Sequence, residues 1–334
     1  SAGILDIKTN ILPNADALFL TAIDPYGHEL WRWTFPVNKL NQQTEQLSPL
    51  SSRPIYTETE NDLTVKANKR TFIFSKKDGQ LKGVSVDNRK ISFANGPRFI
   101  GARRADRSLD QFHNHDDEKA KEKDRTYSEF PDAAVFTKLD VKEDGGNLVV
   151  TANYKLGNLD KAQWTINPSG ELALDYTYNF SGVVDLMGIR FDYPEDQVIS
   201  KRWLGAGPYR VWQNRIHGTQ YDVWENDYND PIPGETFTYP EFKGYFGDVS
   251  WMNIQTKEGT ISLTNEAPDA YIGVYQPRDG RDRLLYTLPE SGISVLNVIP
   301  PVRNKVNSTD LCGPSSQPKW VNGPQTGRVI FRFM

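Results

Sequence analysis

Cysteine is almost absent from this chain of 334 residues, because Cys312 is the only one. A single thiol excludes an intrachain disulfide and a zinc site made of several cysteines. The sequence also lacks any apolar run of about 18 residues, the length that a membrane-spanning helix needs. It begins Ser-Ala-Gly, with neither an initiator methionine nor the charged and apolar regions of a signal peptide. We therefore expect no membrane span, and we expect the native chain to continue upstream of Ser1.

An excess of charge of one sign is also lacking. The 39 basic and 43 acidic side chains leave a formal net charge of −4. Such a surface offers no positive field to a phosphate backbone, so nucleic acid is not an expected partner.

Aromatic residues are plentiful at 12%, and flat rings serve both sheet packing and the stacking of sugar rings.

Helical periodicity is the third absence, because no segment keeps apolar residues at i, i+3, i+4 and i+7 for more than about two turns. Alternation with a period of two recurs instead, and glycine and proline punctuate it. This pattern predicts an all-β chain, built mainly as one large antiparallel β-sandwich.

The first 50 residues differ from the rest. Residues 17–23 and 29–35 alternate as strands, and the turn between them contains Pro25 and Gly27. Residues 37–60 are polar and proline-punctuated, as linkers are. Because a lone hairpin is marginal in water, we expect residues 1–50 to be the end of a small sandwich with its linker, docked on the large sandwich of residues 51–334.

Within the larger part, alternation predicts a hairpin over residues 71–86 and a meander over residues 148–180. Two stretches interrupt this rhythm. Residues 101–131 are highly charged, and their part 116–128 is a candidate for a short surface helix. Residues 203–247 are rich in glycine and aromatic residues and predict a long irregular loop, which is usually functional in a compact domain.

The most specific local pattern is a G-x-G-P turn formed by Gly205, Gly207 and Pro208. Glycine tolerates positive φ and proline fixes the next residue, so we expect the turn to project Trp212, Asn214 and Arg215 outward together. A structural turn without a ligand is the alternative. Among the tryptophans, we expect Trp212 and Trp224 to face a sugar, and we expect Trp251, in an alternating strand, to be core.

Three segments together resemble the C-terminal region of the β-galactosidases of glycoside hydrolase family 2. They are residues 96–107 (GPRFIGARRADR), the G-x-G-P turn with Arg215, and residues 239–244 (YPEFKG) with the later Trp251. The resemblance implies a galactose-mutarotase-like β supersandwich, preceded by the end of an immunoglobulin-like domain. The family loop reads G-x-G-P-x-E-x-Y-x-D-R, and this chain has Arg, Trp and Asn in place of its Glu, Tyr and Asp.

The resemblance also implies a function. Members of that family carry their two catalytic carboxylates on a (β/α)8 barrel, and no alternating βα pattern exists in this sequence. We therefore expect no catalytic residue, no metal and no cofactor in this chain. We expect it to pack on the catalytic barrel of the parent protein and to lend loops to a β-galactoside cleft. The compartment is not fixed by the sequence, and a periplasmic or secreted bacterial protein is the leading interpretation.

The residues expected to contact the carbohydrate are polar or aromatic and come from the three resembling segments and the loop after them. They are Arg98, Arg103, Arg104, Trp212, Asn214, Arg215, Trp224 and Glu241. The alternative for the arginines is that they brace loops through surface ion pairs.

Two other functions stay open. A free-standing aldose 1-epimerase would need a histidine acid and a glutamate base, for which the candidates are His113, His115, His217, Glu225 and Glu241. The charged run around His113 and His115 is more typical of a solvated loop than of a catalytic or metal site. A stand-alone carbohydrate-binding module is the third possibility.

Overall fold

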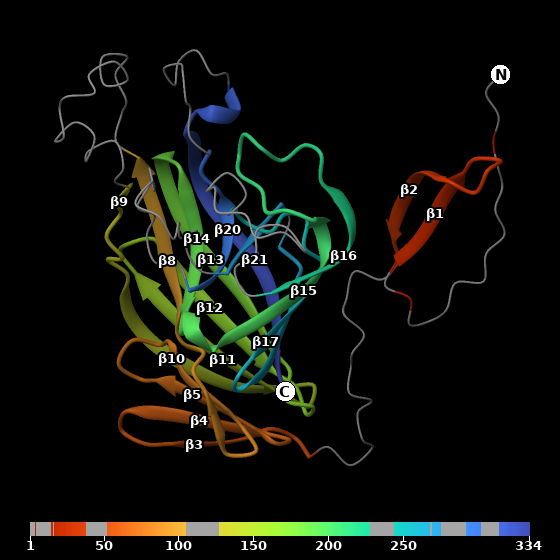
Figure 1. Ribbon diagram of the computed structural model, residues 1–334. Coiled ribbons are helices and arrows are strands. Elements are labelled where there is room, and N and C mark those ends of the chain that lie inside the picture. Colours follow the sequence, from red (N-terminus) through yellow and green to blue (C-terminus); the bar gives the residue numbers. More distant parts are fainter. Residues whose placement is uncertain are drawn as a thin grey trace.

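The computed structural model describes residues 4, 15, 17–37, 52–104, 127–227, 244–267, 269–274, 292–301 and 314–334. Over these ranges the chain is almost entirely antiparallel β-strand, with two short 3-10 turns at Glu195–Gln197 and Pro314–Ser316. Two large sheets pack face to face, and a separate hairpin accompanies them (Figure 1). The all-β prediction is confirmed. Across the described ranges, no helix is long and apolar enough to cross a membrane.

One sheet has nine strands, and the C-terminal strand β21 lies in its middle. In spatial order the strands are β10 (Val135–Asp144), β11 (Asn147–Lys155), β12 (Leu159–Ile166), β13 (Leu172–Val184), β21 (Lys319–Phe333), β18 (Gly259–Asn265), β17 (Trp251–Thr256), β15 (Val198–Gly207) and β16 (Gln220–Asp227). Strand β21 pairs with the full length of β13 on one side and with β18 on the other. The meander predicted over residues 148–180 is present as β11, β12 and β13.

The other sheet has ten strands. Eight of them follow the order β19 (Tyr271–Val274), β20 (Ile293–Val298), β14 (Leu186–Asp192), β8 (Ala94–Arg104), β6 (Leu81–Val86), β5 (Arg70–Ser75), β4 (Asp62–Ala67) and β3 (Ile55–Glu58). The short strands β7 (Arg89–Ile91) and β9 (Tyr127–Glu129) pair with β6 and β8. The hairpin predicted over residues 71–86 is confirmed as β5 and β6.

Aromatic rings fill the space between the two sheets. The Phe93 ring lies 4.8 Å from Phe191 and 5.0 and 5.4 Å from Phe331 and Phe333 of β21, measured between ring centroids. All four side chains are buried, as is Trp251, which confirms its predicted core position. Burying one such ring stabilises the fold by roughly 1.5–3 kcal/mol.

The predicted hairpin is present as β1 (Ala17–Ile23) and β2 (Glu29–Pro36), which pair antiparallel. An ion pair of 3.9 Å between Arg32 Nη1 and Asp222 Oδ2 on β16 links the hairpin to the sandwich. Most of its side chains are exposed or half-exposed. Residues 38–51 lie outside the described ranges, so the domain boundary near residue 50 stays a prediction.

The prediction of an irregular loop over residues 203–247 is wrong in two places. Strand β15 continues to Gly207, and strand β16 begins at Gln220. The two glycines of the motif serve close packing within the sheet. A Cβ on Gly205 would lie 3.0 Å from the carbonyl oxygen of Gly247, and one on Gly207 would collide with the indole of Trp224. Of the expected helix over residues 116–128, only its last two residues are described, and they belong to strand β9.

We predict that Phe93→Ala lowers the free energy of unfolding by about 3–5 kcal/mol, because it leaves a cavity among three aromatic rings. Chemical denaturation measures this. The control is Tyr56→Ala on the edge strand β3, where the ring is exposed and the change should stay within about 0.5 kcal/mol. Equal effects of the two substitutions would contradict the assigned core.

Candidate functional site

Two arginines lie directly opposite each other on the outer face of the ten-stranded sheet. On β8, Phe99 points into the core, so its neighbour Arg98 points to the opposite face. Register pairs Arg98 with Arg190 on β14, whose neighbour Ile189 is also core. Like charges placed opposite each other on a sheet repel, so this pair needs anionic neighbours.

Carboxylates on three segments surround the two guanidinium groups. Arg98 Nη2 donates to Asp192 Oδ1, and Arg98 Nε donates to the carbonyl of Asn95 at 2.9 Å. The amide of Asn95 donates to the other oxygen of Asp192, also at 2.9 Å. Arg190 Nη2 lies 3.9 Å from Glu129 Oε2 of β9. These contacts hold both arginine forks on the outer face.

Burial and charge shift two pKa values here. Burial lowers the pKa of Arg190, and the nearby positive charge of Arg98 adds to this, while three surrounding carboxylates oppose it. Partial removal of the Asp132 carboxyl from solvent raises its pKa, although the residue is exposed overall; the N–H of Ala134 and the two arginines oppose that shift. We call Arg98, Glu129, Asp132, Arg190 and Asp192 the arginine cluster. Its two positive and three negative groups nearly balance.

The next part of the same outer face is apolar and covered. Ile100, Ala102, Leu186 and Leu296 form a buried patch on the sheet, and the chain after β15 lies over it. Val211 and Tyr245 exchange two backbone hydrogen bonds, of 2.7 and 2.8 Å. The cover is completed by Val211, Trp212 and Tyr245 from the two sides of this bridge, together with Ile299, which follows β20.

The structure therefore brings together two of the segments singled out from the sequence, the one that contains Arg98 and the one that follows the G-x-G-P motif. It corrects the predicted orientation of Trp212. Its side chain is only 2% exposed, and its ring meets Tyr245 edge-on with centroids 5.6 Å apart. The apolar patch on the sheet explains this, because an indole gains more by covering Ile100 and Leu186 than by facing solvent. Trp212 is not a surface platform in this chain.

The other residues of the motif are tied to neighbouring segments. Asn214 Nδ2 donates to Ser316 Oγ at 3.3 Å, and the N–H of Gln213 donates to the carbonyl of Pro300 at 3.0 Å. Arg215 is exposed, and its N–H closes a tight turn onto the carbonyl of Trp212 at 2.8 Å. A sugar-contacting role for Asn214 and Arg215 stays a prediction.

The remaining candidates divide by position. Trp224 lies in β16, is half-buried against Gly207, and donates from Nε1 to the carbonyl of Gln220 at 3.1 Å. Arg103 lies four residues after Phe99 on β8, so it is on the same, inward face of the sheet as Phe99 and not on the outer face with Arg98. For Arg104 only the backbone is described, paired with Tyr127.

The acid and base candidates of the epimerase hypothesis are not brought together in the described part of the chain. His217 and Glu225 are exposed, and no hydrogen bond or ion pair between them is seen within those ranges. His113, His115 and Glu241 lie outside the described residues. No group of three or more His, Cys, Asp or Glu side chains that could hold a metal occurs in the ranges the structure covers.

Sequence reasoning missed Glu129, Asp132, Arg190 and Asp192. One signal was available for Arg190. It interrupts the otherwise apolar stretch 186–191, in which both faces of the strand are otherwise buried, and a charge at such a place needs partners.

The fold and the outer-face arrangement are those of an all-β sandwich with a polar, charge-balanced surface beside a covered apolar patch. The family model described as beta galactosidase small chain matches residues 66–300. The chain belongs to this family. No curated protein shows a significant sequence match to it.

Solved structures give weaker similarities. Galactose 1-epimerase from Lactobacillus acidophilus NCFM superposes with a TM-score of 0.45 and 10% sequence identity, covering 84% of this chain and 98% of that chain. The GalM/aldose epimerase homologue from C. elegans superposes with a TM-score of 0.36 and 7% identity, covering 84% and 99%.

We predict that Trp212→Ala lowers the free energy of unfolding by about 3–5 kcal/mol, as expected for loss of a buried ring. The matched control is Trp320→Ala, since that side chain is 71% exposed and its loss should cost no more than about 0.5 kcal/mol. Denaturant titration of both variants makes the comparison. A fully stable Trp212→Ala protein would restore the interpretation of Trp212 as a ligand platform.

Proposed function

We propose that this chain is the non-catalytic carbohydrate-binding and scaffolding region of a β-galactosidase-type glycoside hydrolase. In this proposal it packs on the catalytic barrel and lends its outer face and loops to a β-galactoside cleft. The observation that carries the proposal is the match of residues 66–300 to the beta galactosidase small chain family. Membership of the family supports a carbohydrate-related role, and the finer assignment is ours.

The arginine cluster supports the carbohydrate-binding part. Guanidinium forks present several N–H donors in a fixed plane, and the neighbouring carboxylates offer acceptors, which together suit sugar hydroxyl groups. Asp192 is held by Arg98 and Asn95, and Glu129 faces Arg190, so these carboxylates are engaged in positioning. We assign the cluster a role in orienting the substrate and no bond-breaking step.

The hairpin supports the scaffolding part. Directly opposite residues share a face, so Leu18, Leu20, Ala22, Trp31, Trp33 and Phe35 form one apolar face. Trp31, Trp33 and Phe35 are 51%, 44% and 49% exposed. Exposed apolar faces of this kind mark contacts with other protein surfaces, and a two-stranded hairpin needs such packing for stability. We propose that this apolar hairpin face packs on the rest of the parent protein.

The first test separates an auxiliary region from an enzyme. We predict that the isolated chain neither hydrolyses a nitrophenyl β-galactoside nor accelerates the mutarotation of galactose in polarimetry. Co-expression with the catalytic barrel encoded beside it, or upstream in the same reading frame, should give a stable complex that hydrolyses the galactoside. Arg190→Ala in that complex should raise KM about tenfold, a loss of about 1.4 kcal/mol, with a smaller effect on kcat.

Mutarotation by the isolated chain that Glu225→Gln abolishes would contradict the proposal in favour of an epimerase. Saturable sugar binding by a chain that never associates with the catalytic region would indicate a stand-alone module instead.

The second test concerns the apolar hairpin face. We predict that the double substitution Trp31→Ser and Trp33→Ser weakens association with the catalytic region at least tenfold, because apolar contact area is lost. Analytical ultracentrifugation measures the complex. Tyr26→Ser, at the exposed hairpin turn, is the control and should leave association unchanged. If the unmodified chain, the double variant and the Tyr26→Ser variant associate equally well with the catalytic region, the apolar hairpin face is not part of the interface.

A further inference from the structure

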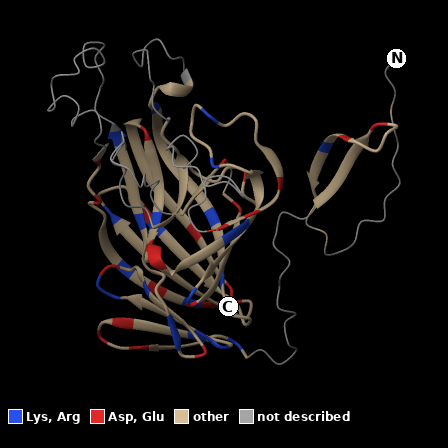
Figure 2. Ribbon diagram, in the orientation of Figure 1, with Lys and Arg blue, Asp and Glu red and all other residues tan. Residues whose placement is uncertain are grey.

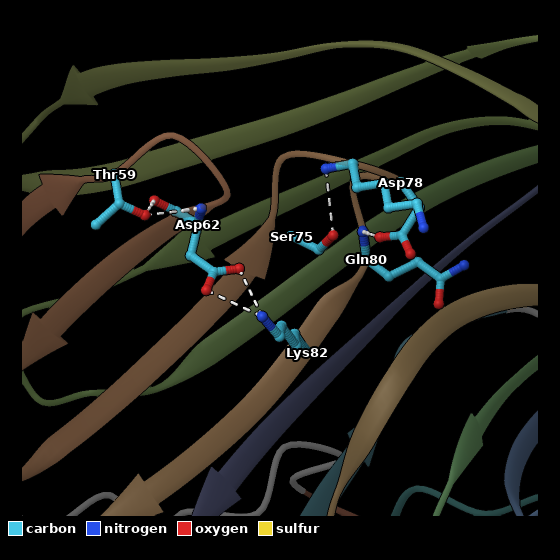
Figure 3. Close-up of polar contacts among 7 residues, drawn as sticks. Thr59, Asp62, Ser75, Asp78, Gln80 and Lys82 are labelled. Carbon is cyan, nitrogen blue, oxygen red and sulfur yellow. Dashed lines mark hydrogen bonds and ion pairs between the residues drawn. The ribbon is translucent and has the colours of Figure 1, made fainter.

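A polar pocket of about 340 Å³ opens at one end of four neighbouring strands of the ten-stranded sheet. Its wall includes Asp62 at the start of β4, the turn between β5 and β6 with Lys77, Asp78 and Gln80, Lys82 on β6, and Asn95 on β8. Figure 3 shows Asp62, Asp78, Gln80 and Lys82. Leu63 and Leu81 point into the core, so Asp62 and Lys82 point to the outer face, as Arg98 does.

Contacts behind the pocket hold several of its side chains in place, namely those of Asp62, Asp78, Lys82 and Asn95. Lys82 Nζ donates to both carboxylate oxygens of Asp62, at 2.9 and 3.0 Å. The N–H of Gln80 donates to Asp78 Oδ1 at 3.1 Å, and the amide of Asn95 is bound to Asp192. Figure 3 shows the contact of Lys82 with Asp62 and the contact of Gln80 with Asp78. Side chains held in this way lose little further freedom when a ligand binds.

The turn itself is anchored to the opposite sheet. Gly79 has a φ of +74°, and a Cβ at this position would lie 2.7 Å from the ring of Phe136 and 2.8 Å from Ala152. Only glycine fits both the backbone conformation and this approach. The pocket wall therefore rests on β10 and β11 and does not depend on a freely moving loop.

Several hydrogen-bonding atoms of the wall are left for a ligand. Within the described part of the chain, Asp78 Oδ2, the side-chain amide of Gln80, Asn95 Oδ1 and Lys77 Nζ take part in no hydrogen bond or ion pair. These atoms supply donors and acceptors in similar number. Such a mixture suits hydroxyl groups, each of which donates one hydrogen bond and accepts others.

The charge of the pocket selects among ligand classes. Lys77 and Lys82 balance Asp62 and Asp78, so the wall has no net charge to attract a phosphate. It holds two carboxylates, and no set of three metal-ligating side chains is found in the ranges the structure covers. Acidic and basic residues are also interspersed along the strands and turns of the two sheets (Figure 2). A neutral, polyhydroxylated molecule fits best.

We propose that this pocket is a second carbohydrate site, which binds one neutral monosaccharide unit through its hydroxyl groups. Its volume lies at the lower end of the range for small-molecule sites, which suits a single sugar ring. Its described wall has no aromatic platform, so affinity comes from hydrogen bonds alone and is of millimolar order. The site adjoins the arginine cluster, because Asn95 of its wall is bonded to Asp192, but its other wall residues lie outside that cluster. It does not depend on packing against a catalytic partner.

The test is a titration of the full chain with methyl β-galactoside and with glucose, observed by saturation-transfer NMR. We expect saturable binding that the double variant Asp78→Asn and Gln80→Ala weakens at least tenfold. Asn at position 78 keeps the acceptor for the Gln80 N–H, so the turn is preserved. Asp140→Asn with Gln325→Ala is the matched control at strand positions outside the pocket and should bind like the unmodified chain. Thermal unfolding confirms that all variants are folded.

Other outcomes overturn the proposal. Loss of sugar binding in Arg190→Ala but not in the pocket variant would place the sugar at the arginine cluster only, and would leave the proposed function intact. Saturable binding of inorganic phosphate or Ca²⁺ that the pocket variant abolishes would show an ionic site. Absence of saturation with both sugars would show that the pocket binds neither. Failure of the chain to associate with a catalytic region would not affect this site.

Discussion

The contact between the aromatic rings of the two large sheets determines which side of their central strands faces inward. Phe191 of β14 and Phe93, which lies just before β8, meet Phe331 and Phe333 of β21 on the other sheet. Along a strand, each neighbour of an inward residue is turned outward. Arg98 therefore lies beside the core residue Phe99, and the pocket residues lie beside core leucines. The arginine cluster and the pocket share one outer face because the core leaves polar groups no other place.

The local parts of this fold were predictable, because hairpins and their turns are encoded by adjacent residues. The period-two pattern located β1, β2, β5, β6 and the meander from β11 to β13. The pairing of Arg98 with Arg190 was not predictable, since it depends on the register of strands about 90 residues apart. Trp212 was misassigned for the same reason. The apolar patch that it covers is assembled from β8, β14 and β20, and no single segment shows it.

The outer face changes character along the ten-stranded sheet. Over β4, β5 and β6 it is polar and neutral, at β8 and β14 it carries paired charges, and further along it is apolar and covered by the chain after β15. Both polar parts balance their charges internally, which lowers the cost of placing ions at a partly dry surface. A neutral ligand of many hydroxyl groups is compatible with both, whereas an ion would disturb the balance of either.

The position of β21 has a consequence for synthesis. It joins β13 to β18, so until it is made the nine-stranded sheet exists as two halves with open edges. Some 135 residues separate the end of β13 at Val184 from Lys319. At ordinary translation rates the first half therefore waits on the order of ten seconds for its neighbour. Protection of that edge during translation, by a chaperone or by its own twist, is thus part of what this chain requires in order to fold.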